Sequence, residues 1–102
     1  MVSIYDKVIL LIYNAIVELN QQLLPEQKVD PSLETVLIGD RAQFDSMALI
    51  TLIVIIGGKI EEEFGVEIIL VGENSVLEES IFTNVSTLAH YIASNIDKEN
   101  GL

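Results

Sequence analysis

Few side chains in this sequence have types and neighbours that suit a reaction. The clearest are Asp45 and Ser46, which stand together directly before the most apolar stretch of the chain. A serine hydroxyl is a weak nucleophile and needs an adjacent base to act in catalysis. The single histidine, His90, belongs to no recognisable motif with a serine, so we expect it at a surface position on a helix. Without a visible nucleophile–base pair, we predict no catalytic residues and no enzyme.

Metal and thiol chemistry have little support in the residue types. The chain has no cysteine, which excludes disulfides, a thiolate nucleophile and a cysteine zinc site. Glu61, Glu62 and Glu63 form an acidic run, but consecutive residues on a helix point in different directions, so we expect a solvated face and no metal site. No phosphate-binding glycine loop, metalloprotease motif or dinucleotide fingerprint is present.

Composition limits the class of protein. The chain has 102 residues, of which half are hydrophobic, and a formal net charge of -11. This length permits one domain, residues 1–102, which we expect to have a core over about 3–96 and a frayed tail over 97–102. The apolar content is too high for a disordered chain. Nucleic-acid binding is not expected, because it needs several Lys or Arg side chains against phosphates.

Two apolar stretches raise the question of membranes. The N-terminal stretch carries Asp6, Lys7, Asn14 and Glu18 at regular intervals, which is typical of an amphipathic helix and not of a signal peptide. The second stretch, residues 47–58, would rise about 18 Å as a helix, against a hydrocarbon core of about 30 Å. We therefore expect no membrane-spanning helix, and we predict a cytoplasmic protein.

The first part of the chain predicts one long helix and one long loop. Apolar residues at helical spacing indicate a helix from Ser3, its N-cap, to about Leu23. Pro25 disfavours its continuation. No helical period persists over residues 25–44, and a loop of that length is often functional. Within it, a short helical turn is expected near residues 31–35.

A second, very apolar helix is expected to begin at Asp45-Ser46, because both residue types are preferred N-caps. It should end at Phe64, followed by Gly65 as the C-terminal cap. Gly57 and Gly58 each cost about 1 kcal/mol relative to alanine in a helix interior, and the sequence leaves open whether they kink the helix. Because apolar residues occur nearly all round it, this helix either fills the core or offers an apolar face to a ligand or partner.

The last third predicts shorter elements. Residues 66–71 have strand-like composition but no partner strand, so we expect an extended loop with buried side chains. A short helix is expected within 76–82 and a last helix from 85 to about 96, capped by Asn84. The predicted fold class is all-α: a small antiparallel four-helix bundle of three main helices and one short helix, with a long loop between the first two.

Asp45-Ser46-Met47, taken with its surroundings, resembles the signature of the acyl carrier protein family. That signature is Asp-Ser-Leu at the start of the second helix, then an apolar helix, then an acidic–aromatic–glycine close. Here an apolar run over 49–56 and Glu-Glu-Glu-Phe-Gly over 61–65 follow the serine. Leu-Ile-Gly-Asp over 37–40 and the segment 84–92 also resemble the family. These matching segments span nearly the whole chain and occur in the same order as in the family.

The resemblance implies that a phosphopantetheinyl transferase esterifies Ser46 with 4′-phosphopantetheine from coenzyme A. The thiol of this arm then carries acyl groups as thioesters between acyl-loading and acyl-using enzymes. Asp45 matches the family's acid that helps the transferase hold its metal and orient the serine. Met47 replaces the usual leucine, a mild change in volume, and is expected to contact the transferase and partners. A phosphodiester at a helix N-terminus is favoured by free N–H groups and the macrodipole.

The family also implies a face that shelters the acyl chain or meets partners, for which the matching residues are Ile50, Val54, Ile68 and Tyr91. Two departures from the family pattern stand out. Ala48 and Thr51 occupy places where typical carriers are acidic, and the second helix is longer by about one turn. We therefore expect a free-standing, monomeric carrier for a specialised lipid or secondary-metabolite pathway, whose partners read apolar contacts over 47–54.

Two alternatives stay open at this stage. One is an aminoacyl or peptidyl carrier, which would use Ser46 in the same way with a different cargo. The other is an unmodified helical interaction module, in which the apolar helix packs on a partner helix. The module predicts that replacing Ser46 by alanine costs only a helix cap, about 1 kcal/mol.

Overall fold

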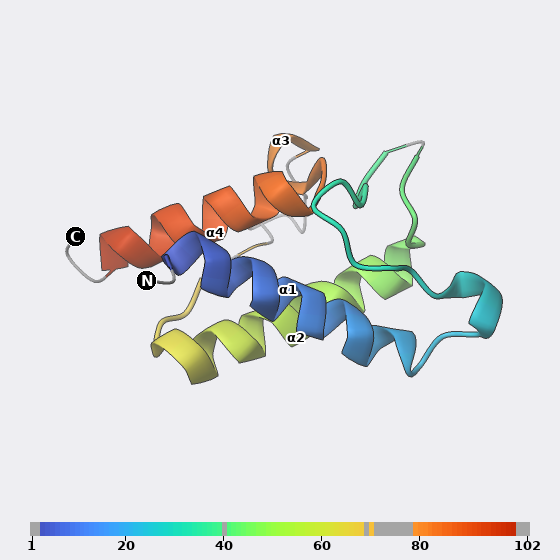
Figure 1. Ribbon diagram of the computed structural model, residues 1–102, viewed down its shortest axis with the longest axis horizontal. Helices are drawn as coiled ribbons and strands as arrows, with labels where there is room; N and C mark the ends of the chain where they lie inside the picture. The colour runs from blue at the N-terminus through green and yellow to red at the C-terminus, as the bar shows by residue number, and fades with distance from the viewer. Residues whose placement is uncertain (1–2, 40, 69, 71–78, 100–102) are drawn as a thin grey trace.

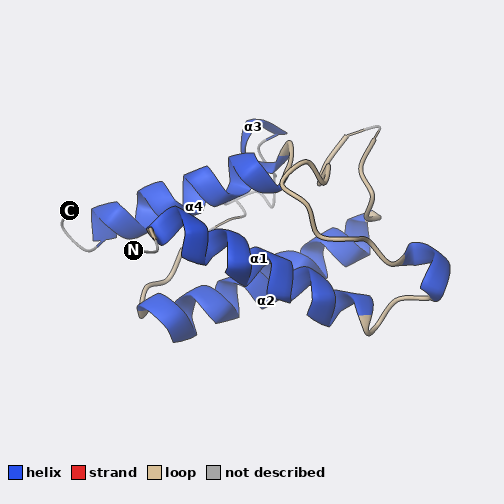
Figure 2. Ribbon diagram, viewed as in Figure 1, coloured by secondary structure: helices blue, strands red, loops and turns tan. Residues whose placement is uncertain are grey.

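The first helix, α1 (Ile4–Asn20), is the element that the other long helices contact. The structure is a computed structural model that describes residues 3–39, 41–68, 70 and 79–99. After α1 come a 3-10 turn, η1 (Pro25–Gln27), and the helices α2 (Ser46–Phe64), α3 (Glu79–Phe82) and α4 (Val85–Glu99). The described residues contain no strand, only an isolated bridge between Val36 and Asn84 (Figure 2). The prediction of a mainly helical chain is confirmed.

The helices are arranged around α1. It packs against both α2 and α4, while the short α3 packs against α4. In Figure 1, α1 runs from left to right, whereas α2 and α4 both run from right to left, so α1 is opposed to its two main neighbours. Burying the inner faces of these helices creates the core, whose largest fully buried side chains include Ile12, Ile16, Leu19, Leu52, Ile56, Phe82 and Ile92.

The start of α1 is capped as the sequence predicts, but its end comes earlier. The Ser3 hydroxyl oxygen accepts a hydrogen bond from the Asp6 amide at 3.1 Å. The helix ends at Asn20, three residues before the predicted Leu23. The Asn20 side chain explains this difference, because its amide group donates to the Val29 carbonyl at 2.9 Å and accepts from the Val29 amide at 3.0 Å. This pair ties the beginning of the loop back to the end of the helix.

The long loop is fixed to the rest of the fold by buried side chains and backbone bonds. Val29, Leu37 and Phe44 are buried in the core. The Val85 amide donates to the Thr35 carbonyl at 3.1 Å, which joins the loop to the start of α4. The short helical turn lies at η1 rather than near residues 31–35, where the structure has only a turn at residues 33–34. That part of the prediction is wrong.

Helix α2 has the predicted bounds. It begins after Asp45 and closes at Gly65, whose φ of 68° lies in the left-handed region that glycine adopts without strain. The helix is unbroken through Gly57 and Gly58, so neither glycine ends it. Its buried residues all lie on one side of the helix: Ala48, Leu49, Leu52, Ile53, Ile56 and Ile60.

The last third of the chain agrees with the prediction in outline. Residues 66–68 and 70 are extended and not a strand, with Leu70 buried, whereas 69 and 71 lie outside the described residues. Helix α3 falls within the predicted 76–82, of which 76–78 are not described. Asn84 caps α4, since its side-chain oxygen accepts from the Thr87 amide at 2.9 Å.

Helix α4 extends further than predicted. It continues to Glu99 instead of ending near Ile96, while 100–102, the rest of the predicted tail, lie outside the described residues. None of the helices in the described part of the chain combines the length and apolar character needed to cross a membrane.

Candidate functional site

The junction between the long loop and α2 contains the predicted site. Ser46 is the first residue of α2, and Asp45 is its N-cap with extended backbone angles, φ −77° and ψ 174°. A side-chain oxygen of Asp45 accepts a hydrogen bond from the Ala48 amide at 2.8 Å. Both Asp45 and Ser46 are exposed. Both residue types were predicted as possible N-caps, and Asp45 is the residue that caps the helix.

The Ser46 hydroxyl has no structural role among its described neighbours. Within the residues that the structure describes, it takes part in no hydrogen bond. It is also solvent-exposed, so an enzyme can approach it from outside. The first turn of α2 contains no acidic residue after the cap, and its Ala48 and Leu49 amides donate to Asp45. An anionic ester on Ser46 would lie at the positive end of the helix dipole.

Beside Ser46, α2 exposes three large apolar side chains, which we call the apolar stripe: Met47, Ile50 and Val54. They are 76%, 43% and 68% exposed. Their spacing of three and four residues puts them on one face of the helix, and Ile50 is one turn after Ser46. Thr51 adds no free polar group to this face, because its hydroxyl donates to the Met47 carbonyl at 2.9 Å. The apolar stripe therefore carries no charged side chain, and the exposed carboxylate beside the serine is that of Asp45.

The other two residues of the predicted acyl-chain or partner face lie elsewhere. Ile68 follows the C-terminal end of α2, and Tyr91 is on α4; both are partly buried and pack against the core. The structure thus brings Met47, Ile50 and Val54 together as an exposed surface but does not add Ile68 and Tyr91 to it. The sequence could not separate these two groups, because apolar residue type alone does not distinguish a core position from an exposed one.

A small cleft that the sequence did not predict lies next to Asp45. Its volume is about 240 Å³, and it is lined by the loop after α1, by η1, by the residues just before α2 and by the first turn of α2: Leu23, Glu26, Gln27, Gln43, Phe44, Asp45 and Ala48. Ala48 is two residues after Ser46, which is about 200° round the helix. The cleft therefore opens on the side of α2 away from the serine. The cleft forms only when the loop folds against the start of α2, so no local pattern in the sequence predicts it.

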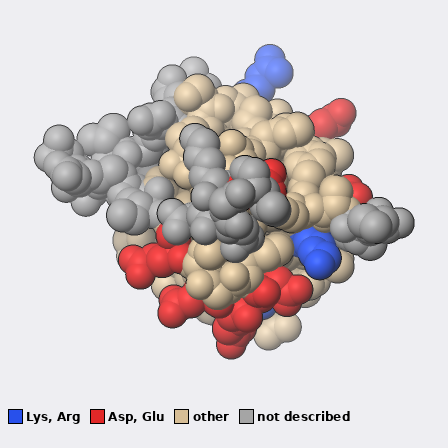
Figure 3. Space-filling model, turned by 90° about the vertical axis from the view of Figure 1, so that its left-hand side faces the viewer, with Lys and Arg blue, Asp and Glu red and all other residues tan. Residues whose placement is uncertain are grey.

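Charge is distributed unevenly along α2. From Ser46 to Gly58 the helix has no ionisable side chain, whereas Glu61, Glu62 and Glu63 follow in its last turns and are exposed. Figure 3 views the end of the molecule at which α2 finishes, and acidic side chains gather on its lower part. The acidic surface is thus separated from the serine by nearly the whole helix.

His90 occupies the exposed position on the last helix that the sequence predicts. Its ring stacks on that of Tyr5, with centroids 4.3 Å apart and an interplanar angle of 17°. The Tyr5 hydroxyl is in turn hydrogen-bonded to the Ser86 hydroxyl at 3.1 Å. These contacts link α1 to α4, which explains His90 as a packing residue on the surface.

No protein-family model matches this chain, and neither a curated protein nor a solved structure matches it. The acyl carrier resemblance therefore depends on the motifs and on the geometry around Ser46 alone.

Proposed function

We propose that this protein is a carrier of the acyl carrier type, with 4′-phosphopantetheine attached to Ser46. The observation that carries the proposal is the state of that serine. It is exposed at the first residue of α2, its hydroxyl is in no hydrogen bond with a described group, and the cap is supplied by Asp45. A serine in this position is available for modification without loss of a structural contact.

Among the described residues no base is hydrogen-bonded to the Ser46 hydroxyl, which is compatible with this function. The modifying transferase supplies the catalytic groups, so the carrier has only to present the hydroxyl. The Ser46 hydroxyl loses its proton to a group of the transferase, its oxygen forms a new P–O bond, a P–O bond in the pyrophosphate of coenzyme A breaks, and the nucleotide leaves. Asp45 is proposed to help orient the serine and the transferase's metal. The arm then provides the thiol that this cysteine-free chain lacks.

The fold and the surface support the same proposal. Opposed packing of α1 against α2 and α4, with α3 on α4, is compatible with a small antiparallel four-helix bundle of the carrier kind. The apolar stripe beside Ser46 is proposed to contact the transferase and the acyl-loading and acyl-using enzymes. We further propose that the carrier acts as a cytoplasmic monomer in a specialised lipid or secondary-metabolite pathway, with an aminoacyl cargo as the alternative.

The experiment is intact-mass measurement after incubation with coenzyme A and a promiscuous phosphopantetheinyl transferase. Ser46→Ala is the test variant. Ser94→Ala is the matched control, because Ser94 is also an exposed helical serine. The parent and the control should each gain a single phosphopantetheine increment, and Ser46→Ala should gain none. A folded parent that gains no mass would contradict the proposal.

The apolar stripe also favours a second candidate, the unmodified helical interaction module. Three large apolar side chains exposed on one helix face are suited to pack on a partner helix. The two candidates differ in what they need. A module would keep its partner in Ser46→Ala and lose it when Met47 and Val54 are replaced by serine, whereas a carrier would lose its activity in Ser46→Ala.

A further inference from the structure

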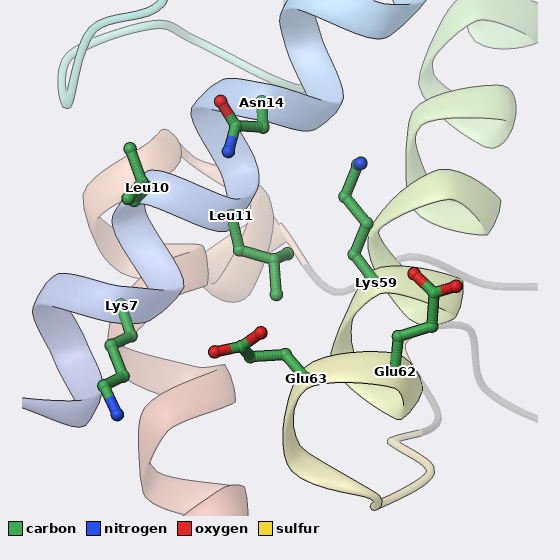
Figure 4. Close-up of a pocket in the computed structure, with 7 residues that line it drawn as sticks. All are labelled: Lys7, Leu10, Leu11, Asn14, Lys59, Glu62 and Glu63. Atoms are coloured by element: carbon green, nitrogen blue, oxygen red, sulfur yellow. The ribbon is translucent and has the colours of Figure 1, made fainter.

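A second surface lies far from the serine, along the contact between α1 and α2. Two neighbouring clefts, of about 250 and 560 Å³, share Lys59 and Glu62 in their linings, and the ion pair of Lys59 with Glu18 crosses from α2 to α1 there. We call the two clefts together the seam furrow and define it by residues that line it: Leu10, Leu11 and Asn14 from α1, and Gly58, Lys59 and Glu62 from α2. Figure 4 shows the first of the two clefts, with side chains from both helices facing the space between them.

The edges of the seam furrow carry apolar side chains that the fold leaves exposed. Leu10 on α1 is 61% exposed, and Val54, which lines the larger cleft on α2, is 68% exposed. Leu11 lies deeper, at 7% exposed. A depression between two helices with apolar sides is the kind of surface on which an amphipathic helix lies.

The charges on the furrow are mainly acidic. Lys59 is neutralised by Glu18, with Nζ and Oε2 3.0 Å apart. Glu61, Glu62 and Glu63 remain, against the one further lysine that lines the furrow, Lys7. In Figure 4, the Glu63 carboxylate points across the cleft toward α1. A partner that fills the furrow therefore has to bring positive charge.

Gly58 gives a further reason to consider this surface as a contact site. Glycine is costly in a helix interior, yet a Cβ atom built at Gly58 meets no other atom within 4 Å. The packing of this chain does not require glycine there. Gly58 is exposed and lines the larger cleft, so its missing side chain leaves the α2 backbone open to close approach from outside.

We propose that the seam furrow binds a basic amphipathic helix of a partner protein. The aliphatic face of that helix lies between Leu10 and Val54 and over Gly58, and its Lys or Arg side chains pair with Glu61, Glu62 and Glu63. A second copy of this chain does not fit, because each copy carries a net charge of -11. Gly58 is about 18 Å along the helix from Ser46, so a partner here leaves the serine accessible.

The test uses the full chain with Ser46→Ala, which makes the result independent of the proposed modification. The probe is a synthetic Leu/Lys peptide of about 18 residues, long enough to be helical and with leucines on one face. A scrambled peptide of the same composition controls for charge alone. Amide chemical shifts should move at Leu10, Asn14, Gly58 and Glu62, and the scrambled peptide should bind at least about tenfold more weakly. Equal binding of both peptides, or shifts centred on Met47 and Ile50, would overturn the proposal.

Two pairs of variants make the test specific. Gly58→Ala should weaken binding of the ordered peptide by at least about fivefold, because the new methyl group occupies the contact. Gly57→Ala changes the same residue type about 100° round the helix, outside the furrow, and should bind as the parent does. Glu62→Gln should weaken binding and reduce its salt dependence, whereas Glu34→Gln, an exposed loop position, should change neither. Equal effects of the two members of either pair would contradict the assignment of the site.

Discussion

The two glycines inside α2 allow the structure to be tested through stability. Gly57 and Gly58 are in a continuous helix, and neither has a positive φ. A Cβ atom at either position meets no atom within 4 Å, so alanine can be added without a clash. The expected gain is then the difference in helix propensity, about 1 kcal/mol at each position. The two added methyl groups point in different directions on the helix. The two gains in the free energy of unfolding should therefore nearly add, to about 2 kcal/mol in the double variant.

The assay is thermal and urea unfolding followed by circular dichroism. For a domain of about 100 residues, 1 kcal/mol raises Tm by about 4–8 °C, so the double variant should melt about 8–16 °C higher. Gly65→Ala is the control, because its φ of 68° is unfavourable for alanine, and it should lose about 1–2 kcal/mol. A decrease in stability for Gly57→Ala or Gly58→Ala would contradict this expectation, because it would mean that the fold itself needs a glycine there.

Further predictions concern the cap, the core and the net charge. Asp45→Ala should lose about 1 kcal/mol in urea unfolding because it removes the bond to the Ala48 amide, whereas Ser46→Ala should stay within about 0.5 kcal/mol; the reverse order would show that the cap is misassigned. Phe82→Ala should lose about 3–5 kcal/mol in the same assay because Phe82 is fully buried, and a loss below about 1 kcal/mol would contradict its place in the core. Raising salt from low to moderate concentration should raise Tm, because it screens repulsion among charges that sum to -11; a Tm independent of salt would contradict this.

The helix boundaries that were predictable are those marked by local chemistry. Ser3, Asp45 and Asn84 are side chains that accept hydrogen bonds from backbone amides at a helix start, and Gly65 adopts a left-handed conformation at a helix end. Each of these signals acts within a few residues, so the sequence contains it directly. The candidate site at Asp45 and Ser46 could be located for the same reason.

The features that were missed depend on contacts between distant segments. Helix α1 ends early because Asn20 bonds to Val29, nine residues away, and no periodicity signals that pairing. Within the predicted acyl-chain or partner face, Ile68 and Tyr91 pack against the core while Ile50 and Val54 are exposed, and the sequence alone does not show this difference. The seam furrow exists only once α1 and α2 are side by side.

Ser46 is proposed to carry the thiol with which this protein works. The most direct measurement is a thiol titration of the chain after reaction with coenzyme A and a transferase and removal of small molecules. Because the chain contains no cysteine, its starting value is zero, and any thiol must come from the arm. One thiol per chain is expected in the parent and none in Ser46→Ala. A folded parent with no thiol, or a thiol that persists in Ser46→Ala, would contradict the attachment of the arm to Ser46.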